Sequence, residues 1–237
     1  MIPESTLADR WQAVNRRVIE AAGRSGRDPA EVTVVAVTKN VPAEEISAAL
    51  RLGLRDLGEN RVQEGLAKQA CLGRDSATWH LIGSLQTNKA KRAAEAFHLI
   101  HALDRWELAL ALAGAGERMG RSIPVLIQVN ASYEASKHGL DPGETMSFVR
   151  RIMALEALSL HGLMTMAPVV SDPGEARPVF RMVHDLFRRV RQELPIGDTW
   201  RFLSMGMSQD FEVAIEEGAN LVRIGTAIFG QRRPAGR

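Results

Sequence analysis

The feature that most constrains the fold of this chain is a regular alternation of short β-branched segments with longer amphipathic ones. The first short segment, residues 32–38, is apolar on both faces, as a strand buried within a parallel sheet must be. Eight such strands are predicted, at residues 32–39, 55–58, 79–83, 98–103, 124–130, 159–166, 200–206 and 221–225. Because the stretches between them have helical spacing, the alternation predicts parallel βα units.

Helix signals support this alternation. Residues 42–52 begin with a proline and two nearby glutamates and are followed by Gly53, in agreement with the capping preferences of helices. Residues 178–194 form a long amphipathic segment whose arginines are predicted to face outward. A further helix is predicted before the first strand, where an apolar stripe is formed by Leu7, Trp11, Val14, Val18 and Ala21.

The number of strands and the chain length together predict the fold class. Eight parallel strands with intervening helices in 237 residues indicate an α/β protein with a single (β/α)8 barrel, or TIM barrel. The alternative is a doubly wound sheet, which is disfavoured because no Gly-x-Gly-x-x-Gly motif follows the first strand. No linker divides the chain, so residues 1–237 are predicted to form one domain, with a disordered tail at 231–237.

Composition narrows the classes of protein to consider. The chain has 30 Lys and Arg residues against 28 Asp and Glu residues, which gives no concentrated basic field for nucleic acid. Its single cysteine, Cys71, excludes an internal disulfide framework and a cysteine-based zinc cluster, and it suits a reducing compartment. The N-terminal segment is charged, and no stretch of about 18 apolar residues is present. We therefore expect a cytoplasmic protein with no membrane, nucleic-acid or metal partner.

Lys39 is the first candidate functional residue, because the carboxyl ends of the strands form the working face of a barrel. It has the same parity as Val35 and Val37, so its ammonium group is expected to point into the mouth of the barrel. Apolar surroundings lower the pKa of a lysine, and a neutral amine attacks a carbonyl to form a Schiff base. The alternative is a lysine that extends to solvent from the end of a strand.

The last two predicted strands end in glycine-rich segments with hydroxyl side chains. Loops at these positions of a barrel often bind phosphate, because glycine allows close approach and a helix N-terminus offers free N–H groups. The residues concerned are Gly206, Gly225 and Gly230, with the hydroxyl groups of Ser204 and Thr226. Ser208 is as well explained as the N-cap of a helix that has Asp210 in its first turn.

Arg223 lies in a predicted central strand, where a guanidinium group requires an anion or another acceptor. Its partner is either a barrel carboxylate, Glu59 or Asp56, or an acidic group or ring nitrogen of a ligand. A lysine on the first strand, a phosphate site after the last two strands and an arginine between them fit a phosphorylated aldehyde. Pyridoxal 5'-phosphate is the candidate cofactor.

Five separated motifs carry a family resemblance. They are Val-Ala-Val-Thr-Lys at 35–39, Gly-Glu-Asn at 58–60 with Val-Gln-Glu at 62–64, His-Leu-Ile-Gly-Ser-Leu-Gln-Thr-Asn-Lys at 80–89, Leu-Ser-Met-Gly-Met-Ser at 203–208, and Val-Arg-Ile-Gly-Thr-Ala-Ile-Phe-Gly at 222–230. In this order they resemble the YggS/PROSC (PLPBP) family of pyridoxal phosphate homeostasis proteins, and the resemblance runs from about residue 5 to 231.

The resemblance implies a barrel like the N-terminal domain of alanine racemase, of pyridoxal phosphate fold type III. It implies that the cofactor is held as an aldimine on Lys39, and that Asn60 and His80 lie near it. Members often have Ser-Lys-Thr-Lys-Pro where this chain has Thr-Lys-Asn-Val-Pro at 38–42, so the second lysine is absent here. Lys137 also fits a family loop motif, although it is equally explained as a solvated loop lysine.

The resemblance also implies roles for the residues near the chain end. Ser204, Gly225 and Thr226 match phosphate-binding positions, and Arg223 matches the arginine that faces the pyridine nitrogen. An arginine there keeps this nitrogen unprotonated, which weakens the ring as an electron sink. The only tyrosine, Tyr133, lies in a predicted loop, so no second base is evident.

We therefore expect a monomer without catalytic residues that binds, buffers and delivers pyridoxal phosphate, as the family is regarded as doing in vitamin B6 and amino-acid balance. Partner apoenzymes that depend on the cofactor would receive it. The alternative is a monomeric racemase or lyase of fold type III, with Lys39 as one base and His80, Lys137 or a water as the other. A third class, a nucleic-acid or protein adaptor, would use the outward arginines of residues 178–194, Arg181, Arg188, Arg189 and Arg191.

Overall fold

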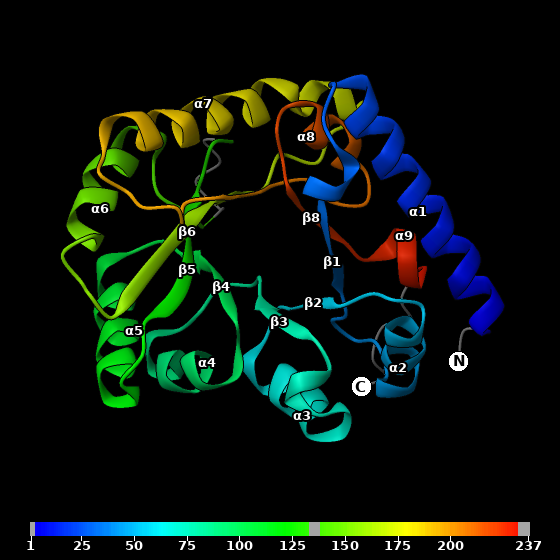
Figure 1. Cartoon of the computed structure of the whole chain (residues 1–237), viewed down its shortest axis with the longest axis horizontal. Helices are drawn as coiled ribbons and strands as arrows, with labels where there is room; N and C mark the ends of the chain where they lie inside the picture. The colour runs from blue at the N-terminus through cyan, green and yellow to red at the C-terminus, as the bar shows by residue number, and fades with distance from the viewer. Residues whose placement is uncertain (1–2, 133–137, 232–237) are drawn as a thin grey trace.

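The computed structural model describes residues 3–132 and 138–231. It is a closed barrel in which eight parallel strands follow one another in chain order, with helices around the outside (Figure 1). The strands are β1 Thr33–Val37, β2 Asp56–Glu59, β3 Thr78–Leu81, β4 Leu99–Leu103, β5 Ile123–Val129, β6 Leu158–Thr165, β7 Phe202–Ser204 and β8 Leu221–Ile224. The barrel closes where β1 pairs with β8, which confirms the predicted fold and rules out the doubly wound sheet.

Among the helices of the described residues, the first precedes the strands, the last follows them, and the others lie in the connections between strands. These helices are α1 Glu4–Arg24, α2 Ala43–Arg51, α3 Val62–Leu72, α4 Ala90–Ala96, α5 Trp106–Met119, α6 Thr145–Ile152, α7 Arg177–Glu193, α8 Phe211–Glu216 and α9 Thr226–Phe229. Short 3-10 helices precede several of them, η1 Pro29–Glu31, η2 Arg74–Ser76, η3 Thr87–Lys89, η4 Pro142–Glu144 and η5 Pro173–Ala176. Both helices predicted within the barrel therefore form, with ends shifted by one residue.

The predicted strands agree with the observed ones except near their ends. The seventh strand was expected at 200–206 but covers only Phe202–Ser204. Gly206 has φ +92°, and a Cβ at this position would lie 2.6 Å from the Cβ of Ala214, so the chain turns there and only glycine fits. Met205 and Gly206, which were predicted as the end of this strand, therefore lie in the loop after β7.

The N-terminal helix α1 packs on the outside of the barrel beside α8 and α9 (Figure 1). Its stripe contains the buried residues Leu7, Val14 and Val18, as its apolar spacing predicts. Arg17 donates to Glu212 Oε1 of α8 at 2.7 Å, and the following turn is held where Arg27 donates to the carbonyl oxygens of Ile215 and Ala219. The extra helix thus covers the segment in which the barrel closes.

The barrel interior combines apolar and polar layers. Its apolar cluster is formed by Val35, Leu99, Leu126, Met164 and Leu221, side chains of the kind that usually fill such barrels. Other positions on the barrel strands hold His80, His101, Ser204 and Arg223, all of them buried. Buried polar groups require hydrogen-bond partners, so this part of the interior is held by hydrogen bonds as well as by apolar packing.

Several expectations concern residues outside the described ones. Tyr133, Lys137 and nearly all of the predicted tail at 231–237 belong to this group. Among the described residues, no helix has the length and apolar character that crossing a membrane would require, and no cluster of three or more potential metal ligands is found. Cys71 is exposed and unpaired.

Candidate functional site

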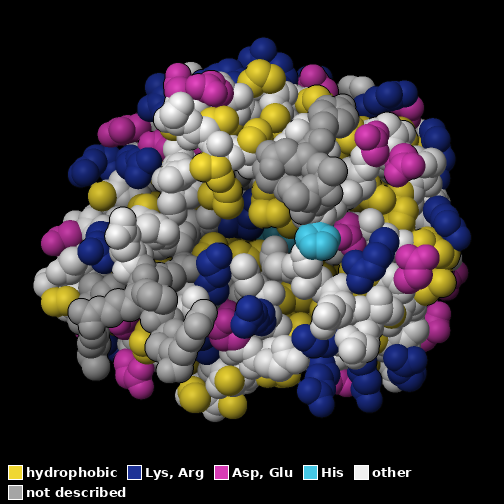
Figure 2. Space-filling view, turned by 180° about the vertical axis from the view of Figure 1, so that it is seen from behind, with side chains coloured by type: hydrophobic (Ala, Val, Ile, Leu, Met, Phe, Trp, Pro, Cys, Tyr) yellow, Lys and Arg dark blue, Asp and Glu magenta, His cyan; other side chains and the backbone are white. Residues whose placement is uncertain are grey.

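A cavity of about 620 Å³ lies at the carboxyl ends of the strands. Its polar lining residues are Lys39, Asn60, Ser84, Gln128, Ser208, Gln209, Arg223 and Thr226, and its apolar ones are Val37, Ile82, Met166, Met207 and Ala227. Figure 2 shows a hollow near the centre of one face of the molecule, with Lys and Arg side chains in and beside it. Such a cleft at the carboxyl end of a barrel is where these folds place their ligands.

Lys39 lines this cavity from the turn after β1. Val37, two residues earlier, lines it as well, so the parity of the strand directs both side chains to the mouth as predicted. Among the described residues, no hydrogen-bond or ion-pair partner of Lys39 Nζ is found. Asn40 follows with φ +58°, a left-handed conformation that is uncommon for a residue other than glycine, and this turn directs the chain away after Lys39.

A buried ion cluster holds the backbone on both sides of Lys39. Lys68 Nζ donates to the Thr38 carbonyl oxygen at 2.5 Å and to the carboxylates of Glu59 and Glu64 at 2.7 Å each. Glu64 Oε1 also accepts from the Asn40 N–H. Burial raises the pKa of Glu59, although Lys68 and Thr38 act in the opposite direction. The cluster therefore fixes the position from which Lys39 projects.

Asn60 and Gly83 form the wall beside Lys39, after β2 and β3. The two segments lie in close contact, because a Cβ at Gly83 would lie 2.4 Å from the Asn60 carbonyl oxygen. Glycine at this position therefore lets the loop after β3 approach the loop after β2, and the Asn60 side chain remains on the cavity wall.

The opposite wall is formed by the loops after β7 and β8. Ser208 Oγ accepts hydrogen bonds from the N–H groups of Gly225 at 3.2 Å and Ala227 at 3.3 Å. Ser208 is therefore not an N-cap, and Asp210 occupies that position before α8 instead of its first turn. Two backbone donors and the hydroxyl groups of Ser208 and Thr226 thus meet at one edge of the cavity, an arrangement suited to an anion.

Arg223 lines the floor of the cavity and is 4% exposed. Its guanidinium group donates to Ser204 Oγ at 2.6 Å and to the Thr165 carbonyl oxygen at 2.8 Å. The predicted carboxylate partners are wrong, because Glu59 pairs with Lys68 and Asp56 pairs with His80. Burial lowers the pKa of Arg223 to about 10, and the charge of Asp210 acts in the opposite direction. The guanidinium group therefore remains charged at neutral pH. This leaves the second predicted kind of partner, an acidic group or ring nitrogen of a ligand.

Ser204 and His80 are not among the residues that line the cavity. Ser204 is fully buried beneath it and contacts His101 Nδ1 at 3.0 Å as well as Arg223. His80 lies deeper in the barrel, 3.0 Å from His101 Nε2 and 2.9 Å from Asp56 Oδ1. The structure therefore brings Lys39, Asn60, Arg223, Gly225 and Thr226 together at the cavity, and it separates Ser204 and His80 from them.

Sequence reasoning missed two features of the site. His101 occurs in a strand, Leu99–Leu103, whose sequence gives no sign that one of its residues belongs to a polar chain. Gln128, at the end of β5, lines the cavity and donates to the His138 carbonyl oxygen at 2.9 Å. A polar residue at a strand end was a signal that could have identified Gln128, by the rule applied to Lys39.

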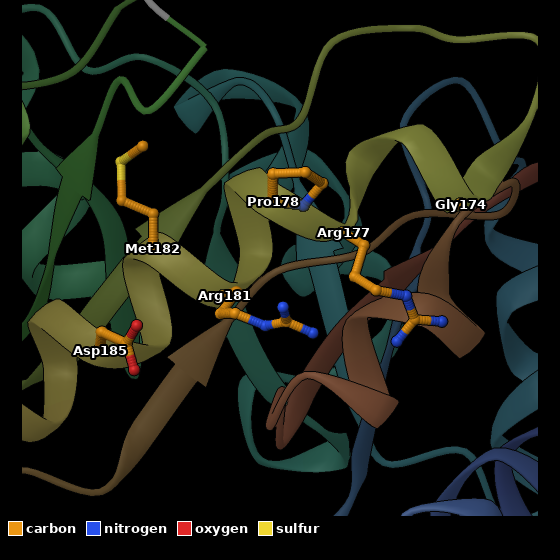
Figure 3. Close-up of a pocket in the computed structure, with 6 residues that line it drawn as sticks. All are labelled: Gly174, Arg177, Pro178, Arg181, Met182 and Asp185. Carbon is orange, nitrogen blue, oxygen red and sulfur yellow. The ribbon is translucent and has the colours of Figure 1, made fainter.

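The arginines of α7 lie away from this cavity, on the outer surface. Figure 3 shows Arg177 and Arg181 extending from the helix beside a shallow open pocket. Arg181 donates to both carboxylate oxygens of Glu217 at 3.0 and 3.1 Å, and Arg189 donates to Glu193 at 2.6 Å. Their charges are thus partly neutralised by glutamates of the same chain, which favours an ion-paired surface over a nucleic-acid interface.

Comparison with known proteins identifies relatives along nearly the whole chain. A protein of Pseudomonas aeruginosa named pyridoxal phosphate homeostasis protein is 43% identical over 235 residues, which cover 96% of each chain. A protein of the same name from Escherichia coli K12 is 39% identical, with 95% of this chain and 97% of the relative covered.

The chain belongs to the pyridoxal phosphate homeostasis protein family. This membership confirms the resemblance indicated by the sequence motifs. The family model for the alanine racemase N-terminal domain matches residues 12–233, in agreement with the predicted barrel.

Solved structures within and beyond the family share this fold. PipY of Synechococcus elongatus, solved with PLP bound, is 36% identical and has a TM-score of 0.81, with 94% of this chain and all of PipY covered. Alanine racemase from Bartonella henselae is 18% identical with a TM-score of 0.72, and the match covers 98% of this chain but 60% of the racemase. At that identity the racemase shows a common fold and leaves the activity of this chain open.

Proposed function

We propose that this chain binds pyridoxal 5'-phosphate in the cavity and acts as a carrier that buffers and delivers the cofactor. The observation that carries the proposal is that one cavity brings together the Lys39 amine, the Arg223 guanidinium and the hydroxyl and N–H groups of the loops after β7 and β8. The names of the relatives and the PLP-bound structure of PipY support the same ligand.

Lys39 is the proposed point of covalent attachment. Its Nζ lines the cavity and has no partner among the described residues, whereas the other lysine nearby, Lys68, has its Nζ bonded to three oxygens. The neutral amine would add to the aldehyde carbon, and loss of one water would give the imine. Hydrolysis restores both partners, so the attachment is reversible, as a carrier requires.

The phosphate is proposed to lie against Gly225, Thr226 and Ser208. Ser208 Oγ accepts from two N–H groups at this edge, so its own O–H can donate to a phosphate oxygen. Thr226 is exposed at the mouth of the cavity and can add a second hydroxyl. Ser204 is assigned a role beneath Arg223 instead of contact with the phosphate.

Arg223 is proposed to face the pyridine nitrogen. A charged guanidinium disfavours a second positive charge on the ring, so the bound cofactor would be a poor electron sink. Among the described lining residues, Lys39 and Arg223 are those with ionisable side chains. A racemase requires bases on both faces of the cofactor, and this lining supports binding and delivery over the alternative of a racemase or lyase.

Equilibrium dialysis tests the carrier mechanism. Wild-type protein should bind pyridoxal 5'-phosphate with a yellow absorbance and bind unphosphorylated pyridoxal far more weakly. The double variant Ser208→Ala, Thr226→Ala should lose retention by roughly tenfold or more, because charge-assisted hydrogen bonds to an anion are strong. Ser84→Ala, at the other side of the same cavity, is the matched control. Equal affinity for pyridoxal and its phosphate ester, or amino-acid racemisation at an enzymatic rate, would contradict the proposal.

The remaining expectations extend this proposal. Delivery to cofactor-dependent apoenzymes, a monomeric state and a cytoplasmic location stay predictions.

A further inference from the structure

A chain of hydrogen-bonded side chains crosses the barrel interior beneath the cavity. It runs from Arg223 to Ser204 at 2.6 Å, from Ser204 to His101 at 3.0 Å, from His101 to His80 at 3.0 Å and from His80 to Asp56 at 2.9 Å. Its members come from β8, β7, β4, β3 and β2. The chain therefore links strands on different sides of the barrel through its interior.

One assignment of hydrogens satisfies every contact with both imidazoles neutral. Arginine can only donate, so Ser204 Oγ accepts from Arg223, and in this assignment the Ser204 O–H donates to His101 Nδ1. His101 then carries its hydrogen on Nε2 and donates to His80 Nδ1, and His80 Nε2 donates to the Asp56 carboxylate. Burial, with smaller effects of His80 and Arg223, holds the pKa of His101 well below its ordinary value, in agreement with a neutral ring.

The far end of the chain is open to a second cavity. Asp56 and His80 line a cavity of about 300 Å³ at the amino ends of the strands, together with His161 and Arg201. Arg223 lines the upper cavity at the other end. The chain is thus the polar connection between the two mouths of the barrel, with a cation at one end and a carboxylate at the other, and each bond polarises the next.

The chain determines how Arg223 is held. Within the described part of the chain, the acceptors of its guanidinium group are neutral, Ser204 Oγ and the Thr165 carbonyl oxygen. In this assignment His101 takes the Ser204 hydrogen, which fixes the direction of the lone pair that Ser204 presents to Arg223. Without that acceptor the hydroxyl would rotate, and the guanidinium group would lose one of its two orienting contacts.

We propose that His101 is a positioning residue which, through Ser204, fixes the Arg223 guanidinium in the orientation that meets the ring nitrogen of the bound cofactor. This inference rests on the proposed function, because it assumes that pyridoxal phosphate occupies the upper cavity. His101 itself does not line that cavity, so its effect on the cofactor is indirect.

The test compares His101→Leu, which removes the acceptor, with His101→Asn, whose side-chain oxygen can replace Nδ1 as the acceptor of the Ser204 O–H. Ser204→Ala is the smaller truncation of the same link. His161→Leu is the matched control, because His161 is a half-buried barrel histidine outside the chain whose Nδ1 has no partner among the described residues. Each variant is measured without cofactor and with pyridoxal phosphate.

Without cofactor, NMR of the Arg223 guanidinium should show slow rotation in wild type and His161→Leu, and faster rotation in His101→Leu and Ser204→Ala. With pyridoxal phosphate, His101→Leu and Ser204→Ala should shift the absorbance and the ring-nitrogen ¹⁵N signal and weaken binding about five- to tenfold, the effect of one lost hydrogen bond. His101→Asn should restore both signals and bring the affinity to within about twofold of wild type.

The outcomes separate the two proposals. A wild-type protein that does not bind pyridoxal phosphate contradicts the proposed function, while the guanidinium rotation still reports on the chain. Normal cofactor binding with unchanged rotation and unchanged ring-nitrogen signal in His101→Leu and Ser204→Ala would overturn the positioning role, as would an equal change in His161→Leu.

Discussion

Two buried cations in this barrel are held in opposite ways. Lys68, behind the wall that carries Lys39, bonds two carboxylates and one carbonyl oxygen. Arg223, on the floor of the cavity, bonds a hydroxyl group and a carbonyl oxygen and, among the described residues, no carboxylate. The first charge is compensated within the protein, whereas the second is available to a ligand.

This difference indicates a division of roles. A lysine with three acceptors is fixed in one geometry and stabilises the turn that carries Lys39, so it has no free donor with which to meet a substrate. An arginine whose acceptors among the described residues are neutral keeps its positive charge at the cavity, where it can meet a ring nitrogen or an anion. We therefore assign Lys68 to the structure of the barrel and propose Arg223 for recognition of the ligand.

The largest effect is expected for Lys68→Met, measured by urea unfolding of the cofactor-free protein. The variant leaves Glu59 and Glu64 buried or half-buried without their cation, and loss of one partner of a buried ion pair typically costs about 3–5 kcal/mol. The matched control is Lys91→Met, an exposed lysine 3.9 Å from Glu95, which should leave the unfolding midpoint nearly unchanged. Equal effects of the two substitutions would contradict a structural role for the Lys68 cluster.

A smaller loss of stability is expected for Arg223→Met. Its partners among the described residues are neutral oxygens, so the cofactor-free variant should lose about 1–3 kcal/mol of unfolding free energy, the range for unsatisfied neutral groups. The absorbance of bound pyridoxal phosphate should change strongly in the same variant. A loss of stability as large as that of Lys68→Met, with an unchanged absorbance, would show that Arg223 is the structural cation after all.

The pH dependence of the unfolding free energy tests the state of His101, the residue that we propose positions Arg223. The pKa of His101 is lowered by burial in the folded protein, so its proton is bound mainly by the unfolded chain. Its contribution to stability is therefore present above about pH 6.5 and is lost as the pH falls below this value. His101→Asn should flatten the fall in unfolding free energy between about pH 7.5 and 5, with a residual slope from the other histidines whose pKa burial lowers, His98, His161 and His184. An unchanged slope would show that His101 is not the neutral imidazole of the chain.

The smallest effect is expected for an ion pair on the surface. Arg189 and Glu193 lie one helical turn apart on α7, with both side chains exposed, and such pairs contribute little because solvent screens them. Arg189→Ala should change neither the unfolding midpoint nor the affinity for pyridoxal phosphate. A salt-dependent affinity for DNA that this substitution abolishes would instead support the adaptor alternative.

The barrel was predictable because its strands and helices have distinct periods. The parity of β1 was sufficient to direct Lys39 to the cavity, and glycine with hydroxyl residues identified the loops after β7 and β8. Ser208 was ambiguous because a serine before a helix fits an N-cap as well as a cavity wall. Its actual partners, the Gly225 and Ala227 N–H groups, are contributed by another loop.

The depth at which each polar side chain lies within the barrel was not predictable from the sequence. Ser204 is the last residue of β7 and His80 lies within β3, and a sequence motif does not distinguish a side chain that reaches the cavity from one that lies below it. His101 has no local signal at all, because its role depends on contacts with strands 21 and 103 residues away in sequence. Contacts of this kind follow from closure of the barrel.

The most direct test of the account is the identity of the lysine that bonds the cofactor. Purified protein loaded with pyridoxal phosphate is reduced with borohydride and mapped by peptide mass spectrometry. The account predicts the pyridoxyl group on Lys39, whose Nζ faces the cavity without a partner among the described residues, and loss of the yellow absorbance in Lys39→Ala. A pyridoxyl group found mainly on Lys68, Lys89 or Lys137 would contradict it.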